Sequence, residues 1–102
     1  MELTVLYPQP TDSEKFESDY KAHLQLLHKE TGIPNEAKPY TVTKFLPGPE
    51  GNPPFYQMFA MSFDSPEAFQ EAMASSGMQK VAADANRIST GGAPTILIGQ
   101  DQ

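Results

Sequence analysis

The sequence contains no cysteine in its 102 residues. A disulfide framework, a thiolate metal site and a thiol nucleophile are therefore excluded. A reducing compartment is the simplest location consistent with this absence. Long apolar runs are also missing, because no segment approaches the ~20 apolar residues of a membrane span. The start at Met1–Pro8 lacks the basic region and long apolar core of a signal peptide. We therefore expect a cytoplasmic protein without a membrane partner.

Positive charge is scarce as well. Seven Lys and Arg residues stand against thirteen Asp and Glu residues, which gives a formal net charge of −6. A surface of this sign repels phosphate backbones instead of releasing counterions from them. Nucleic acid is accordingly not an expected partner.

The length is that of a single domain, spanning residues 1–102, with no internal repeat and no low-complexity tail. A domain of this size buries roughly 65% of the surface that its unfolded chain exposes. One modest core is therefore expected.

The first part of the chain predicts a strand followed by a helix. Residues 2–8 alternate between two sides with the period of a strand. Thr11 begins a capping-box pattern, and Asp12 is an alternative cap one residue later. Apolar side chains then recur every three or four residues, which predicts a helix to about Lys29. They are Phe16, Tyr20, Leu24 and Leu27.

Two further strands and an interrupted helix follow. Residues 40–46 are rich in β-branched and aromatic side chains, residues 55–63 are mostly apolar or aromatic, and a loop dominated by Pro and Gly separates the two segments. A second helix begins at Pro66. Residues 75–77 interrupt this helix before it resumes over 78–87, a pattern that fits a kink or two short helices equally well.

A glycine turn precedes the last predicted element. Gly91 and Gly92 resemble a phosphate-binding loop only superficially, and a tight turn is the better interpretation. The run that follows, Thr95–Ile98, has the composition of a short buried strand.

The order strand, helix, strand, strand, helix, strand predicts an α+β, ferredoxin-like βαββαβ domain. Its four-stranded antiparallel sheet carries both helices on one face. Seven of the nine residues 55–63 are apolar or aromatic, and they point to both sides of the sheet. One explanation is a large core with some exposed apolar residues. A second copy that covers the open face explains the pattern better, and predicts a homodimer in which two sheets form an eight-stranded barrel.

Four segments resemble the EthD-like family, named for a component of ethyl tert-butyl ether degradation, and together they span nearly the whole chain. They are Val5–Pro8, the Phe16-x-x-x-Tyr20 pattern with His23 after it, Phe63–Ser65 with Ala68, and Thr90–Gly92 with Thr95 and Leu97–Gly99. The first helix carries His23-Leu24-Gln25-Leu26, where family members often have His-x-Pro-Leu.

The resemblance implies the dimeric α+β barrel fold. Many EthD-like proteins have no assigned activity. Related barrels include monooxygenases, polyketide cyclases, decarboxylases and lactone isomerases, so the resemblance implies a fold and a dimer more than a reaction.

His23 is the main candidate for a catalytic group. It lies seven residues after Phe16 and four before Leu27, so its imidazole sits on the stripe that faces the sheet. In a pocket it would act as a general acid or base, with Tyr20 or Tyr7 orienting it or a substrate oxygen. The alternative is a histidine at the edge of the core that is satisfied by a backbone carbonyl.

His28 and the acids are weaker candidates. His28 lies on another helix face beside charged residues, and we expect it to be solvated, like the acids Glu14, Glu17, Asp19, Glu67 and Glu71. The two histidines are five residues apart and do not share a helical face, so no metal site is expected. No cofactor is expected either. A haem would require an axial ligand, and His23 is the only residue that could serve as one.

Apolar side chains indicate the chemical class of the expected ligand. Methionines and phenylalanines, among them Met58 and Phe63, line either an adaptable apolar pocket or simply the core. We expect a small apolar organic ligand bound near Tyr7, Tyr20, His23, Phe63 and Met58. Cofactor-free proton transfer, a non-catalytic binding or accessory role in a catabolic pathway, and a cofactor-independent oxygenase all remain open.

Overall fold

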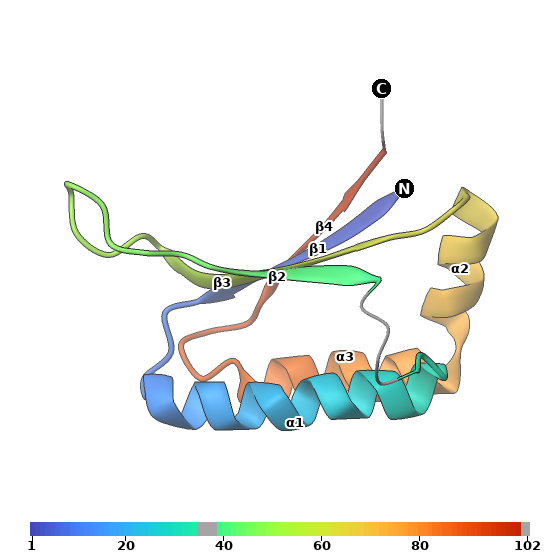
Figure 1. Cartoon of the computed structure of the whole chain (residues 1–102), viewed down its shortest axis with the longest axis horizontal. Coiled ribbons are helices and arrows are strands. Elements are labelled where there is room, and N and C mark those ends of the chain that lie inside the picture. Colours follow the sequence, from blue (N-terminus) through green and yellow to red (C-terminus); the bar gives the residue numbers. More distant parts are fainter. Residues whose placement is uncertain (35–38, 101–102) are drawn as a thin grey trace.

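The computed structural model describes residues 1–34 and 39–100. Its elements are β1 (Glu2–Pro8), α1 (Ser13–Thr31), β2 (Tyr40–Lys44), β3 (Phe55–Ser62), α2 (Pro66–Ala74), α3 (Ser76–Ile88) and β4 (Thr95–Gly99). The strands form one antiparallel sheet in the order β2-β3-β1-β4. Figure 1 shows α1 and α3 side by side along one face of the sheet, with no helix on the other. The predicted α+β, ferredoxin-like fold is confirmed.

The core lies between the sheet and the two long helices. Strand β1 buries alternate residues, as the period-2 pattern predicts, and α1 buries its stripe at helical spacing. The principal core residues are Leu3, Val5, Tyr7, Phe16, Tyr20, Leu27, Phe59, Val81, Ala85 and Ile88. None of the helices in the described ranges is long and apolar enough to cross a membrane.

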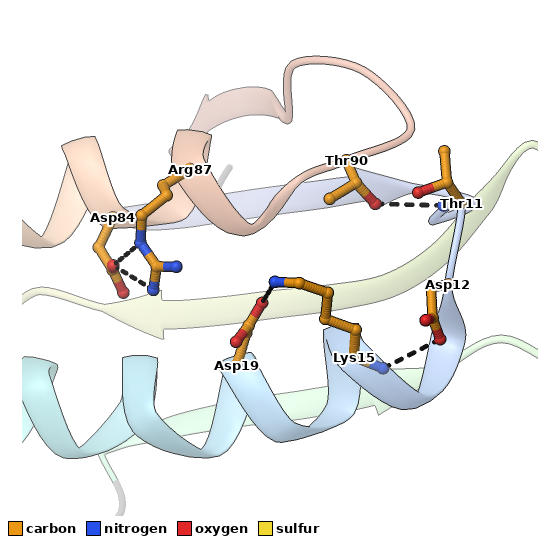
Figure 2. Close-up of polar contacts among 7 residues, drawn as sticks. All are labelled: Thr11, Asp12, Lys15, Asp19, Asp84, Arg87 and Thr90. Atoms are coloured by element: carbon orange, nitrogen blue, oxygen red, sulfur yellow. Dashed lines mark hydrogen bonds and ion pairs between the residues drawn. The ribbon is translucent and has the colours of Figure 1, made fainter.

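Both ends of α1 are closed by specific residues. The Asp12 carboxylate accepts a hydrogen bond from the Lys15 backbone N–H at 3.2 Å, so the alternative cap is the one used (Figure 2). At the other end, Gly32 adopts φ 76° and its N–H donates to the carbonyl of His28. This left-handed cap lets α1 run to Thr31, two residues beyond the predicted end.

Ser75 divides the second helical segment into two helices instead of a kinked one. Its Oγ accepts a hydrogen bond from the Met78 N–H at 3.1 Å, and its own N–H donates to the carbonyl of Ala72 at 3.2 Å. One residue therefore ends α2 and starts α3. Gly77 follows at a close approach, because a Cβ there would overlap the carbonyl oxygen of Glu30. The start of α3 thus lies directly against the end of α1.

Strand β4 corrects one prediction from the sequence. We expected a buried strand, but all five of its residues are exposed in the protomer. The reason is its position at the edge of the sheet, where it pairs only with β1. Its apolar side chains are about half exposed, at 52% for Ile96, 51% for Leu97 and 57% for Ile98.

Two strand ends also differ from the prediction. The ladder between β2 and β3 extends only to Lys44, so β2 is two residues shorter than expected. Strand β3 ends at Ser62, and Phe63 follows it, donating its N–H to the carbonyl of Met1.

A bulge in β3 brings an extra side chain to the helix side of the sheet. Tyr7 pairs with Gln57, whereas Pro8 pairs with Phe55, so Tyr56 has no partner of its own. The Tyr56 hydroxyl donates a hydrogen bond to Glu17 of α1. Glu17 is exposed, as expected of a solvated acid, and this hydrogen bond also ties α1 to the sheet.

The helix-free face of the sheet is uncharged over most of its area. We call the side chains there the open face, and the strand registers assign to it Glu2, Thr4, Leu6, Thr41, Thr43, Met58, Ala60, Ser62, Thr95 and Leu97, of which only Glu2 is charged. Met58 points to this face and its neighbour Phe59 points into the core. The apolar side chains of β3 do emerge on both sides.

Candidate functional site

A small cavity lies between the sheet and the helices. Its volume is about 100 Å³, and its walls are almost entirely apolar. The lining side chains come from β1, β3, β4 and all three helices. They are Leu3, Val5, Tyr7, His23, Leu27, Phe59, Met61, Met73, Met78, Val81, Ala82, Ala85 and Ile96.

His23 is the one imidazole in this wall. The residue is only 5% exposed, because its place on the α1 stripe turns it toward the sheet. Its Nδ1 lies 2.9 Å from Oδ2 of Asp84, a residue of α3 that is 61 positions away in sequence. Contact between α1 and α3 thus creates a His–Asp pair beside the cavity.

Arg87 completes this pair from the solvent side. Its Nε and Nη2 both lie 2.8 Å from Oδ1 of Asp84, as Figure 2 shows. Burial tends to raise the pKa of Asp84, but hydrogen bonds from His23 and Arg87 outweigh it and hold the pKa below its ordinary value. Asp84 is therefore ionised at neutral pH.

The ionised carboxylate determines the state of His23. Burial lowers the pKa of His23, and the hydrogen bond to Asp84 offsets this only in part. The imidazole is therefore neutral at pH 7. Because Asp84 can only accept, Nδ1 carries the proton, and Nε2 is left with a free lone pair.

Tyr7 and Tyr20 surround His23 with protonated hydroxyls. The Tyr20 ring lies 5.6 Å from both the Tyr7 and His23 rings, measured between centroids. Burial raises the pKa of Tyr7, and the charge of Asp84 adds to the rise. Burial and then Tyr7 also raise the pKa of Tyr20, whereas Gln57 lowers it to a smaller extent. Both phenols remain hydrogen-bond donors across the physiological pH range.

Two buried donors lie one layer behind the cavity wall. Within the described part of the chain, the Tyr20 hydroxyl and Nε2 of Gln57 have no hydrogen-bond partner. The Gln57 amide is near enough to influence the pKa of Tyr20, but the two groups do not reach hydrogen-bond geometry. Buried polar groups usually have a partner, so an oxygen atom that reached this point would be held by two donors.

The structure brings together some of the residues expected at the site and separates others. His23 and Tyr7 line the cavity, and Tyr20 packs directly behind them. Phe63 lies outside the cavity, in a neighbouring groove. Met58 is on the open face, on the opposite side of the sheet.

His28 corrects a further expectation. It was expected to be solvated, but it is half-buried and bonded on both ring nitrogens. Its Nδ1 lies 3.1 Å from the carbonyl oxygen of Ile33, and its Nε2 lies 2.7 Å from the Tyr40 hydroxyl. His28 therefore fastens the end of α1 to the start of β2.

Sequence reasoning missed Asp84 and Arg87. Their spacing of three residues on one helix is a local signal for an ion pair. Nothing local links either residue to His23. Across residues 1–34 and 39–100, no three His, Asp or Glu side chains converge in a way that would hold a metal ion.

The low pKa of His23 predicts a pH dependence of stability. Because folding holds this pKa below its ordinary value of 6.5, the unfolded chain binds the proton more readily. The free energy of unfolding should fall as the pH drops below 6.5, by at most about 1.4 kcal/mol per pH unit. Urea unfolding at pH 7.5, 6.5 and 5.5 measures this.

His23→Gln should lack that slope. Asp84 does not blur the result, because its pKa is lowered from 3.8 and its own contribution is lost only at more acid pH. An identical slope in the wild type and in His23→Gln would contradict the assignment of a neutral, buried imidazole.

Comparison with known proteins places this geometry in a wider context. The family model described as the EthD domain matches residues 8–91. A crystal structure of an ethyl tert-butyl ether (EthD) family protein from Bacillus halodurans C-125 superposes with a TM-score of 0.81 at 29% sequence identity. The match covers 99% of this chain and 97% of that one. No curated protein matches the sequence.

Proposed function

The chain belongs to the EthD family, and from this premise we propose that it binds a small, largely apolar organic molecule beside His23 and transfers a proton on it without a cofactor. Cyclisation, isomerisation and decarboxylation are the reaction classes that need only such a step. His23 is the acid or base, and Tyr7 and Tyr20 orient the imidazole or a substrate oxygen.

The observation that carries this proposal is a neutral, buried imidazole in the wall of an apolar cavity. Its Nδ1 is held by Asp84 at 2.9 Å, which leaves the Nε2 lone pair to accept a proton. A base in a desolvated site needs no reorganisation before the transfer.

The size of the cavity limits the part of the ligand that lies beside His23. An apolar cavity of about 150 Å³ holds benzene in another protein. The cavity described above is about 100 Å³, so it accepts a group no larger than one small ring unless its walls move. Three methionines in the wall make such movement inexpensive.

A ligand titration tests the binding step. Ala82 is exposed but lines the cavity, so Ala82→Phe should block the cavity without overpacking the core. We expect saturable binding of benzene to the wild type by calorimetry, and at least tenfold weaker binding to Ala82→Phe. Ala83→Phe is the matched control, because Ala83 is exposed and lies outside the cavity wall. Equal affinities for all three proteins would overturn the assignment of the cavity.

We also propose that the protein is a homodimer, built through the open face and β4. Apart from Glu2 at one end, the open face is uncharged, and β4 exposes Ile96, Leu97 and Ile98 at the sheet edge. Monomers rarely leave a contiguous apolar patch above a few hundred Å² uncovered. In such a dimer Met58 lies at the interface between the two copies. Met58 would then contact a ligand only inside the barrel that the two sheets enclose.

Sedimentation tests the dimer. At micromolar concentration the wild type should sediment as a particle of twice the 11.2 kDa chain mass. Leu97→Glu places a charge on the open face and should give a particle of one chain mass, because burying an unpaired carboxylate costs several kcal/mol. Ala83→Glu, on the exposed surface of α3, should remain dimeric. A wild-type particle of one chain mass would remove the dimer.

Two other functions predict different outcomes. A non-catalytic binding or accessory protein would bind benzene and release its natural ligand unchanged, which mass spectrometry of co-purifying molecules detects. A cofactor-independent oxygenase would consume dissolved oxygen in step with product. Turnover that persists under anaerobic conditions supports proton transfer and excludes the oxygenase.

A further inference from the structure

A second depression lies next to the cavity, in the space between β3, α2 and the end of α1. We call it the outer groove. Its volume is about 440 Å³, and its wall is mixed: Ile33, Phe63 and Ala72 are apolar, whereas Glu30, Thr31, Glu71 and Ser75 are polar or charged. The outer groove is therefore several times larger than the cavity beside His23.

Two methionines belong to both spaces. Met61 of β3 and Met78 of α3 line the cavity on one side and the outer groove on the other. Met61 is half-buried, and Met78 is 7% exposed. A methionine side chain has three rotatable bonds and repacks at little cost. The partition between the two spaces thus consists of the side chains best suited to move.

We propose that the outer groove is the second compartment of the same binding site and that the ligand is an elongated apolar molecule. Its small head lies beside His23, and its alkyl or aryl tail passes between Met61 and Met78 into the outer groove. This inference rests on the proposed function, because it assumes that the cavity binds the reacting group. Phe63, which does not line the cavity, contacts the tail.

The charges at the outer groove restrict the tail. Glu71 is exposed at its edge, and Glu30 lies there with Lys80 at 3.8 Å from its carboxylate. A carboxylate or sulfate at the end of the tail would meet like charge here. The tail therefore carries no negative charge, and the reacting oxygen or C–H group is at the head.

A homologous series of probes tests the two-compartment site. Benzene, toluene, propylbenzene and pentylbenzene share a ring that fits beside His23 and differ only in tail length. Each methylene group that leaves water should tighten binding about fourfold. Because the cavity has room for little more than the ring, gains that continue through propylbenzene and pentylbenzene require a second space. Calorimetry on the whole chain measures them.

Filling the outer groove should abolish only the contribution of the tail to the binding affinity. Ala72 is half-buried in its wall, so Ala72→Phe occupies the space that the tail would take. We expect the affinity for pentylbenzene to fall by at least tenfold and the affinity for benzene to stay within twofold. Ala74→Phe is the matched control, because Ala74 is an exposed residue of α2 outside this wall.

The outcomes separate this inference from the function on which it rests. If benzene does not bind at all, the cavity assignment fails and the proposed function fails with it. If benzene binds but affinity stops rising at toluene, only the second compartment is refuted. Continued gains that Ala72→Phe leaves intact would place the tail elsewhere and would also refute it.

Discussion

Replacing His23 with alanine is expected to reduce turnover by ~10²–10⁴-fold, the usual contribution of a positioned general acid or base. The loss follows from the geometry, since the described wall of the cavity contains no other imidazole or carboxylate. Tyr7 cannot substitute, because its raised pKa keeps it protonated. The proposed dimer should persist, because His23 lies on the helix side of the sheet. Initial rates and sedimentation on the same preparation measure both.

Asp84→Asn distinguishes a chemical role of His23 from a merely structural one. Removing the carboxylate takes away the interactions that raise the pKa of His23, so this pKa should fall further. The acidic limb of the pH–rate profile should then move to lower pH, while the rate at its plateau falls less than in His23→Ala. Loss of packing alone would lower the rate without moving the limb.

The control for these variants is His28→Gln. His28 bonds to the Tyr40 hydroxyl and to the chain after α1, and it does not line the cavity. The His28→Gln substitution should lower the free energy of unfolding and leave the pH–rate profile unchanged. Turnover that survives in His23→Ala would remove the catalytic role of His23 and assign the proton transfer to another group.

Gly91→Ala is expected to destabilise the fold by about 3 kcal/mol or more, at the upper end of single-residue effects. A Cβ at this position would overlap the main-chain carbonyl oxygen of Gln9. Separating the two segments would also break the hydrogen bond that the Thr11 N–H donates to Oγ1 of Thr90 at 3.1 Å (Figure 2). Relieving the overlap therefore pulls the start of β4 away from β1.

Gly48→Ala is the matched control for that prediction. A Cβ at Gly48 has no atom within 4 Å, so the free energy of unfolding should change by no more than about 0.5 kcal/mol. Urea unfolding of the three proteins at pH 7.5 gives both differences. Equal free energies of unfolding for Gly91→Ala and Gly48→Ala would contradict the close contact between Gly91 and the Gln9 carbonyl.

Much of the fold could be predicted because the signals are local. The alternation in β1 and the stripe of Phe16, Tyr20 and Leu27 in α1 follow from the periods of a strand and a helix. The cap at Asp12 and the break at Ser75 are marked by residue type, although the sequence did not distinguish a break from a kink. His23 was predicted to face the sheet for the same reason.

Other features depended on which segments meet. Composition predicted that β4 is a strand, but not that the edge position would leave Leu97 exposed. The alternation of β3 placed Met58 and Phe59 on opposite faces, yet it did not say which face the helices cover. The composition of a segment indicates whether it favours a strand. The burial of each side chain in that strand depends on the neighbouring elements that pack against it.

By itself, the sequence determined the order of the elements, the residues that each helix and strand turns to one side, and the position of His23 on an inward stripe. Only the tertiary structure decided that Asp84 meets His23 and that Met61 and Met78 divide two spaces. The physical reason is distance along the chain. Periods of 2 and 3.6 residues orient a side chain relative to its near neighbours, and they carry no information about a partner 61 residues away.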